Sequence, residues 1–246
     1  MVSGVGTGER GTAALAVLKG QGVKDDLVQR LEAYPTGIVT VEVDEGGKPT
    51  FEIGQDAAWD HWEWNQAIEE KVRGADAVCF GTLGQRGQSA RAGIRKAMQL
   101  AKEKGIIRVH DVNLRPPFFD DALIRDSLAL CSVYKLSDDE LERVCQACGI
   151  QLSDDPLQSL QAILEKYALD VLVMTKGAEG AVLLTSDSTH EQPGVKATIV
   201  DTVGAGDSFT AALTLGLLRK DPFPDILRHA CEVAAQVCSH AGAVPA

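Results

Sequence analysis

The sequence predicts an α/β fold in which a mostly parallel sheet is flanked by helices. Apolar, β-branched runs alternate with helical stretches of about ten residues or more, the pattern of strand–helix–strand crossovers. The chain has 246 residues without an internal repeat or a low-complexity linker, which at about 150 residues per domain favours a single domain over 1–246. One segment, 36–54, alternates polar and apolar residues and predicts a β-hairpin within that domain.

The elements follow from local signals in chain order. A helix over Thr12–Gly20 precedes the hairpin strands Thr36–Val43 and Thr50–Ile53, and a glycine-rich turn at 45–48 joins them. Apolar runs then predict strands over Asp76–Phe80, Ile106–Val112, Val133–Leu136, Val171–Thr175 and Ala181–Leu184. Longer periodic stretches, one of them stopped by Gly105, predict helices over Gln88–Lys104, Asp121–Leu130, Asp138–Ala147, Leu157–Tyr167, Ala205–Leu218 and Pro224–His240.

The charge balance limits the classes of partner. Lys plus Arg is 24 and Asp plus Glu is 35, so the formal net charge is −11. Nucleic-acid and anionic-membrane surfaces call for basic proteins, whereas a small anionic ligand responds only to the local field. The longest apolar stretch, near Phe209–Leu218, is about half a membrane span, and the start of the chain lacks the pattern of a signal peptide. We therefore expect a cytoplasmic protein with no nucleic-acid or membrane partner.

The cysteines and histidines predict no metal site. Cys79, Cys131, Cys231 and Cys238 lie in apolar surroundings and are expected to be small core residues. Cys145 and Cys148 form a CxxC inside an expected helix, but no second ligand pair has metal-ligand spacing. The five histidines show no ligand spacing either.

Two glycine-rich stretches have a structural and a functional interpretation. Gly6–Gly11 matches GxGxxG, but a dinucleotide site needs a strand before that turn, and only five residues precede Gly6. We therefore favour a simple turn there. Thr175–Gly180 follows a buried-type strand without Walker spacing, so it is either a hairpin turn or a strand end that faces a ligand.

The third stretch, Asp201–Phe209, carries the most information. Gly204 and Gly206 flank Ala205 where a helix begins, so that backbone N–H groups can converge on an anion without side-chain obstruction. Asp207 follows in the first turn. Its simplest role is to stabilise the helix end by about 0.3–1 kcal/mol. Its sharper role is to take a hydroxyl proton beside an anion hole, the arrangement needed for phosphoryl transfer to an alcohol.

On these residues the chain resembles the ribokinase-like (PfkB-type) carbohydrate kinases, in particular fructokinase- and ketodeoxygluconate-kinase-like members. Asp201–Asp207 matches their DTxGAGD signature in every fixed position. Asp111–Arg115 resembles their DxNxR segment, Lys135–Glu140 their NxxE segment and Thr175–Gly177 their TKG turn. Ala234-Ala235 and Gly242-Ala243 resemble the closing loop. The resemblance implies a three-layer Rossmann-like architecture in which the 36–54 hairpin is a small β lid.

The resemblance also implies roles for residues that match its motifs. Asp207 would be the general base, and the backbone of Gly204, Ala205 and Gly206 would form the anion hole. Asn113 and Arg115, with Asp207, would lie near the substrate. Glu140 would act in the Mg²⁺–phosphate network, and Asp201 with Gly242 would hold a monovalent cation such as K⁺. The ATP-binding set would be Lys135, Ser137, Glu140, Thr175, Lys176, Gly177, Gly180, Ala235 and Gly242.

The sequence departs from the family pattern in two places. Ser137 stands where the NxxE segment has Asn, a mild change because a hydroxyl still donates and accepts hydrogen bonds. The sugar-binding Asp and the Gly-Gly-x-x-x-Asn segment, which occupy about the first fifty residues of members, have no match here, and Val2–Gly6 resembles the strand that follows them.

These observations leave more than one function open. The first is ATP-dependent phosphorylation of a sugar hydroxyl on a fructose-like ketose or a sugar acid. The alternatives are a catalytically impaired kinase-like protein that binds a nucleotide or a partner, and a kinase of a non-sugar alcohol such as a nucleoside. Because the sugar-binding end lacks its motifs, we expect weak or no sugar phosphorylation from this chain alone. A homodimer that forms through the lid is a further expectation.

Overall fold

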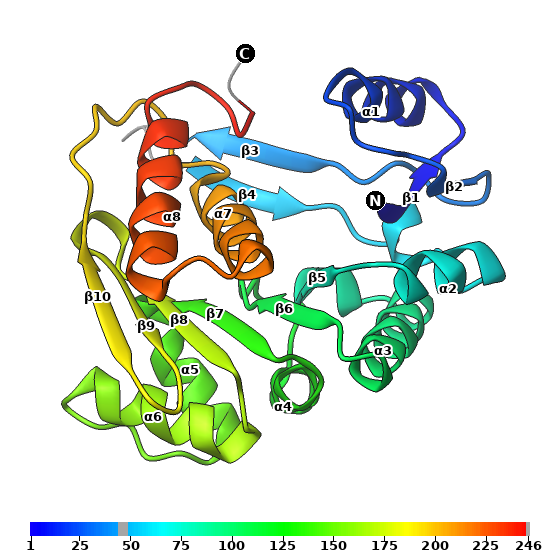
Figure 1. Cartoon of the computed structure of the whole chain (residues 1–246). Coiled ribbons are helices and arrows are strands. Elements are labelled where there is room, and N and C mark those ends of the chain that lie inside the picture. Colours follow the sequence, from blue (N-terminus) through cyan, green and yellow to red (C-terminus); the bar gives the residue numbers. More distant parts are fainter. Residues whose placement is uncertain (44–48, 245–246) are drawn as a thin grey trace. The chain divides into compact units, whose positions relative to one another are not determined.

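The structure is a computed structural model that describes residues 1–43 and 49–244 (Figure 1). The chain divides into two compact units, one of Met1–Gly74 and Gly84–Leu100, the other of Ala75–Leu83 and Ala101–Ala246. The predicted turn at 45–48 lies outside the described residues. The single domain over 1–246 and the lid role of 36–54 stay predictions.

The first unit contains two pairs of strands. Strands β1 (Val2–Gly6) and β2 (Leu27–Leu31) are parallel and are connected by helix α1 (Glu9–Gly20). Strands β3 (Val39–Val43) and β4 (Pro49–Ile53) form the predicted antiparallel hairpin, with Val39 opposite Ile53. The unit also holds the short helix η1 (Ala58–Asp60), helix α2 (Gln66–Arg73) and most of helix α3 (Gln88–Glu103).

Strand β1 corrects one expectation, because the GxGxxG stretch does have a strand before it. A Cβ atom at Gly11 would lie 1.9 Å from the carbonyl oxygen of Gly6, so only glycine lets α1 approach β1 this closely. Gly11 therefore serves the packing of this helix on this strand.

A buried ion pair fixes the base of the hairpin in the first unit. Arg86 donates to both carboxylate oxygens of Asp60, each at 2.8 Å, and to the carbonyl of Gly54 at 2.6 Å. Asp60 also accepts the N–H of Ala57. The ring of Trp59 lies against Gly37, next to the hairpin. Such a bidentate, buried pair holds its partners in one geometry.

The second unit is built on a six-stranded sheet of order β10-β9-β8-β7-β6-β5 (Figure 1). The strands are β5 (Ala77–Gly81), β6 (Ile107–Asp111), β7 (Val133–Ser137), β8 (Val171–Thr175), β9 (Gly180–Leu184) and β10 (Thr189–Pro193). Strands β5 to β8 are parallel, and β9 and β10 are antiparallel to their neighbours. The predicted mostly parallel sheet is confirmed. Strands β2 and β10 were not predicted.

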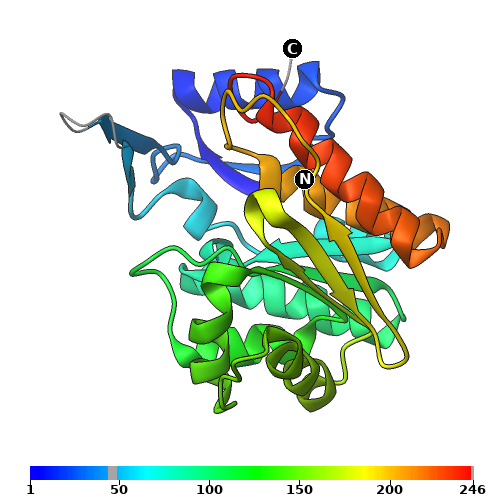
Figure 2. The same cartoon turned by 90° about the vertical axis from the view of Figure 1, so that its left-hand side faces the viewer.

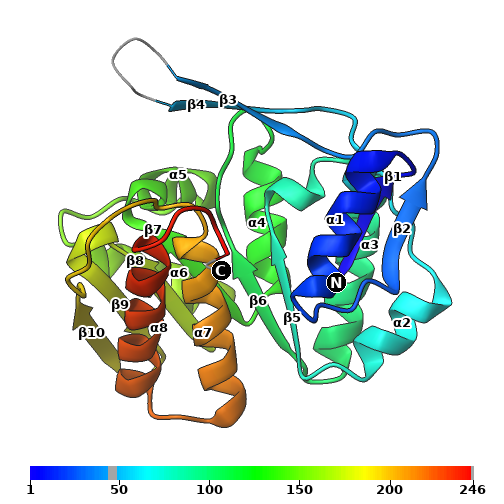
Figure 3. The same cartoon turned by 90° about the horizontal axis from the view of Figure 1, so that it is seen from above.

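Helices cover both faces of this sheet (Figures 1, 2 and 3). One face carries α4 (Asp121–Leu130), α5 (Asp138–Cys148) and α6 (Pro156–Tyr167). The other carries α7 (Ala205–Arg219) and α8 (Phe223–Cys238), which lie side by side. This three-layer arrangement confirms the predicted α/β class.

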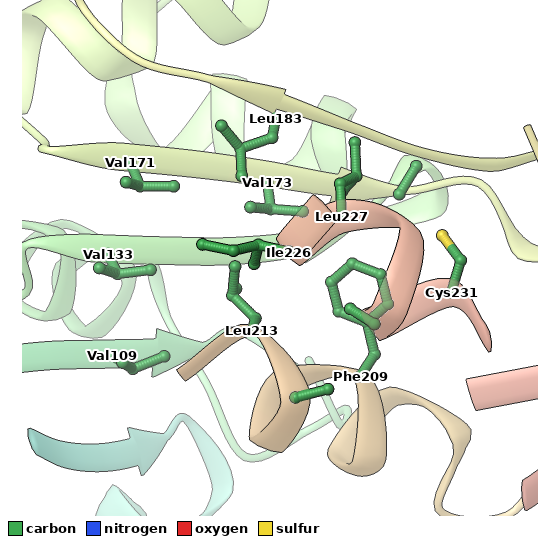
Figure 4. Packing of buried hydrophobic residues seen from close by; sticks show 13 residues of the cluster. Val109, Val133, Val171, Val173, Leu183, Phe209, Leu213, Ile226, Leu227 and Cys231 are labelled. Atoms are coloured by element: carbon green, nitrogen blue, oxygen red, sulfur yellow. The ribbon is translucent and has the colours of Figure 1, made fainter. Parts of the chain in front are cut away.

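A core of buried side chains joins the sheet to α7 and α8 (Figure 4). Val109 of β6 and Val133 of β7 pack there with Phe209 and Leu213 of α7. Burying a side chain of this size stabilises a fold by about 1.5–3 kcal/mol. Because strand side chains alternate between faces, the residues two positions later lie on the same face, toward α7: Asp111 at the end of β6 and Lys135 in the middle of β7.

The cysteines follow the prediction with one exception. Cys131, Cys231 and Cys238 are buried, as are Cys145 and Cys148, whereas Cys79 is exposed. Cys79 belongs to β5, the outermost strand of its sheet, which the apolar run around it did not reveal. The described residues contain no group of three His, Cys, Asp or Glu that could hold a metal ion. No helix in the described part of the chain has the length and apolarity needed to cross a membrane.

Candidate functional site

The first turn of α7 presents backbone donors without partners. Gly204, the residue before the helix, has a φ of +83°. The N–H of Ala205 donates to the carbonyl of Thr202 at 3.2 Å, and that of Ser208 donates to Gly204 at 2.8 Å. Among the described residues nothing accepts from the N–H groups of Gly206 and Asp207. Such donors at a helix start favour an anion. Gly206 and Asp207 carry these unpartnered N–H groups. The N–H of Ala205, which the resemblance also places in the anion hole, is used to close the turn.

Asp207 lies beside these N–H groups and has an exposed side chain. It lies in the first turn of α7 and is exposed, and its side chain makes no hydrogen bond or ion pair with other described residues. Its carboxylate is therefore free to accept a proton or a hydrogen bond from a ligand next to the unpartnered N–H groups.

A second set of contacts fastens the loop before α7 to the C-terminal segment. The carboxylate of Asp201 accepts the N–H of Val203 at 3.0 Å and that of Gly242 at 2.9 Å. The hydrogen bond from Val203, followed by that from Gly242, lowers the pKa of Asp201 below its usual value. A Cβ atom at Gly204 would meet the backbone of Ala243 at 2.9 Å. The structure thus brings Asp201 and Gly242 together, as the sequence predicts.

Below the first turn of α7 lies a buried cluster of three polar side chains. The ammonium of Lys135 donates to the Asp111 oxygens at 3.0 and 3.2 Å, and these side chains are 8% and 14% exposed. The hydroxyl of Thr210 lies 2.7 Å from Oδ2 of Asp111 and 3.0 Å from the carbonyl of Gly206. A Cβ atom at Gly206 would lie 3.2 Å from Nζ of Lys135. A positive charge therefore lies close to Gly206, one of the two residues with an unpartnered N–H.

The sequence motifs assign no role to Asp111 or to Thr210. A signal for Asp111 was present, because an acid that ends a buried parallel strand projects at the edge where helix N-termini gather. Thr210 lies 99 residues from Asp111 in the chain, and no local pattern links them.

Glu140 connects helix α5 to the loop that follows β6. One of its oxygens accepts the N–H of Ser137 at 2.8 Å, which caps α5, and the other accepts the N–H of Leu114 at 2.6 Å. Leu114 lies between Asn113 and Arg115, both of which are exposed. Asn113 has a φ of +41°, which marks a sharp turn at this point. Glu140 thus ties the loop that carries the predicted substrate residues to the start of α5.

The remaining predicted residues are placed at strand and helix ends. Thr175 ends β8, and its hydroxyl lies 3.4 Å from the carbonyl of Leu136. Lys176 begins a short 3₁₀ turn, Gly177–Glu179, and its N–H donates to Gly180 at 2.7 Å. The carbonyl of Ala235, on α8, accepts the hydroxyl of Ser239 at 3.1 Å. These contacts define the turn between β8 and β9 and the end of α8.

The chain is similar to known carbohydrate kinases over its whole length. The sequence model described as pfkB family carbohydrate kinase matches residues 1–246. The fructosamine kinase FrlD of Bacillus subtilis (strain 168) is 31% identical over 193 residues, which are 70% of this chain and 68% of the relative. Fructokinase-2 of Solanum habrochaites is 27% identical over 258 residues, covering all of this chain and 77% of the relative.

Solved structures agree in fold. The crystal structure of fructokinase with bound ATP from Xylella fastidiosa superposes with a TM-score of 0.86 at 20% identity, covering 99% of this chain and 81% of that one. Aminoimidazole riboside kinase from Salmonella enterica, in complex with aminoimidazole riboside and an ATP analogue, gives a TM-score of 0.79 at 21% identity, covering 98% and 80% of the two chains.

Proposed function

The chain belongs to the pfkB family of carbohydrate kinases, and on that premise we propose that it transfers the terminal phosphoryl group of ATP to a hydroxyl of a fructose-like ketose or a sugar acid. The observation that carries this proposal is the first turn of α7, where unpartnered N–H groups of Gly206 and Asp207 adjoin the exposed carboxylate of Asp207. The fructosamine kinase and fructokinases among the relatives support a ketose or a derivative of one.

In the proposed reaction, Asp207 accepts the proton of the substrate hydroxyl as its oxygen bonds to the phosphorus and the bond to ADP breaks. The N–H groups of Gly206 and Asp207 donate to the oxygens of the migrating group, on which charge develops. The ammonium of Lys135, beneath Gly206, adds positive charge at the same place. Asn113 and Arg115, on the loop tied to Glu140, would contact the substrate.

The nucleotide would be held along the strand ends that lead to this turn. The proposed contacts come from Lys135, Ser137 and Glu140 on one side, and from the turn Thr175–Gly180 with Ala235 and Gly242 on the other. Each oxygen of Glu140 already accepts one backbone N–H and keeps lone pairs for a water molecule. This fits a contact through water to Mg²⁺, which would neutralise phosphate charge when bound with the nucleotide.

A monovalent cation would be held near Asp201. Two backbone N–H groups donate to this carboxylate and lower its pKa, and one of them is that of Gly242. An ionised carboxylate at a loop junction fits K⁺, whose charge would offset that of Asp201 and stabilise the loop before α7.

The test is phosphorylation by the purified protein, followed as ADP release with Mg²⁺-ATP. The panel is fructose, a fructosamine, ribose, ketodeoxygluconate and a nucleoside. We expect any turnover to be with a ketose or sugar acid and to be weak, because the sugar-binding motifs have no match in this sequence. Turnover only with the nucleoside would overturn the substrate class, and ATP binding without any turnover would favour the impaired kinase-like alternative.

The role of Asp207 is tested by Asp207→Asn, which keeps the size of the side chain and removes its basicity. We expect kcat to fall about 10²–10⁴-fold, as for other general bases, while ATP binding measured by calorimetry is retained. The matched control is Asp225→Asn, an exposed acid in the first turn of α8, which should leave kcat within about twofold. A loss of less than about tenfold for Asp207→Asn would reject the general-base assignment.

A further inference from the structure

We propose that Asp111 and Thr210 are positioning residues that lock the phosphate-binding turn of α7 onto the end of β6 and the middle of β7. This inference rests on the proposed function of that turn and deepens it. Neither side chain needs to touch a substrate. Thr210 acts through the helix that carries Gly206 and Asp207, and Asp111 acts through Thr210 and Lys135.

Thr210 makes a short hydrogen bond to Asp111. The hydroxyl of Thr210 has one proton and two nearby acceptors, Oδ2 of Asp111 at 2.7 Å and the carbonyl of Gly206 at 3.0 Å. The carboxylate is the closer and the charged acceptor, so it is the stronger one. Thr210 is 7% exposed, which shields this bond from water. It therefore joins the second turn of α7 to the carboxyl end of β6.

Asp111 also forms an ion pair with Lys135. The two residues face each other in the parallel register of β6 and β7. Both oxygens of Asp111 lie within hydrogen-bond distance of the ammonium, and the side chains are 14% and 8% exposed. A charge that is this buried would destabilise the folded protein if its partner were absent. Asp111 thus fixes where the Lys135 ammonium can be.

The charge of Lys135 lies next to the first turn of α7. The Lys135 ammonium would be only 3.2 Å from a Cβ atom at Gly206, so the backbone of Gly206 rests almost directly on it. Asp111 consequently sets two things at once: the position of the Gly206 and Asp207 donors, through Thr210, and the position of the cation beneath them. A displacement of about 1 Å in such a site can lower a rate 10²-fold.

The experiment removes only the hydroxyl with Thr210→Val and restores it with Thr210→Ser. We expect Thr210→Val to lower kcat about 10–100-fold with the KM for ATP changed less than about threefold, and Thr210→Ser to recover most of kcat. The matched control is Thr214→Val, one turn further along α7. Thr214 is equally buried and donates to the carbonyl of Thr210, but not to Asp111.

A readout that needs no turnover separates this inference from the proposed function. The N–H of Ser208, which donates to Gly204, reports on the first turn of α7 in hydrogen exchange followed by NMR. We expect its exchange to accelerate about tenfold or more in Thr210→Val and not in Thr214→Val. Equal exchange and equal kcat in these two variants would overturn the positioning role. Accelerated exchange in a protein that phosphorylates no sugar would reject the proposed function and leave the positioning role standing.

Asp111→Asn extends the test to the ion pair. The amide keeps an acceptor for Thr210 but leaves the ammonium of Lys135 without a counter-charge, so we expect a larger loss of kcat than for Thr210→Val. If this variant does not fold, the comparison of Thr210→Val, Thr210→Ser and Thr214→Val still decides the proposal.

Discussion

Gly204 shows how one residue ties the site to the C-terminal segment. Its φ of +83° lies in the left-handed region, and a side chain there would collide with the backbone of Ala243. The atoms of Ala243 that such a side chain would meet include backbone atoms, which cannot move aside as a flexible side chain would. The glycine is therefore needed for two independent reasons, conformation and space.

The corresponding prediction concerns Gly204→Ala. We expect it to lower the free energy of unfolding by about 3 kcal/mol or more and to abolish most turnover, because the turn must shift. The control is Gly149→Ala at the end of α5, where φ is +61° but no atom lies within 4 Å of the added methyl group. That change should cost only about 1–2 kcal/mol. Urea unfolding measures both, and equal losses would contradict the steric argument.

At the scale of elements, helix α5 and the loop after β6 are fastened by one side chain. Glu140 accepts the N–H of Ser137 at the start of its own helix and the N–H of Leu114 across 26 residues of sequence. A helix cap thus also holds the loop that carries the proposed substrate residues Asn113 and Arg115. The motif that predicts Glu140 implies a role in the Mg²⁺–phosphate network and indicates neither of these two contacts.

Glu140→Gln tests this double role. An amide has one carbonyl oxygen, so one of the two N–H groups would face an NH₂ group instead of an acceptor. We expect a loss of about 1–3 kcal/mol in the free energy of unfolding. Hydrogen exchange at Leu114 should also accelerate. Glu142→Gln, an exposed position on the same helix, should change neither measurement. Unchanged exchange at Leu114 would show that the loop is held by other contacts.

At the scale of the whole molecule, the sheet contains a buried histidine on the face opposite the α7–α8 core. His110 stacks on Phe80 at 4.5 Å between ring centroids and lies 5.4 Å from the ring of Tyr134. Its nearest polar contact is the hydroxyl of Thr82 at 3.5 Å. Burial disfavours the charged ring and lowers the pKa of His110 from 6.5 to about 3.

This shift predicts a pH dependence of stability with a defined sign. Between pH 6.5 and about 3 the unfolded chain binds a proton that the folded protein excludes, so stability falls as the pH is lowered through this window. One proton contributes a slope of up to about 1.4 kcal/mol per pH unit. His110→Phe should reduce the slope measured by urea unfolding at pH 4 to 7. The control His229→Phe, at an exposed position on α8, should leave the slope unchanged. An unchanged slope in His110→Phe would show that other groups cause the pH dependence.

Much of the fold could be predicted because most elements carry their signals locally. Helix α4 and strand β8 have the predicted bounds, and β1, which resembles a family strand, spans the Val2–Gly6 segment. The two missed strands lack such signals: β10 is the polar sequence Thr-His-Glu-Gln-Pro, and β2 is interrupted by Gln29 and Arg30. The backbone partners of these strands, not their side chains, make them strands.

The sequence by itself determined the fold class, the family and the turn at Asp201–Asp207, because glycines, helix starts and buried strands are written in neighbouring residues. Only the tertiary structure decided how that turn is supported. It assigned the N–H of Ala205 to Thr202, joined Glu140 to Leu114, and placed Thr210 and Lys135 on Asp111. These partners are set by the register of β6 with β7 and by the packing of α7 on the sheet. Hydrogen bonds between residues far apart in the chain depend on that packing, which no local pattern records.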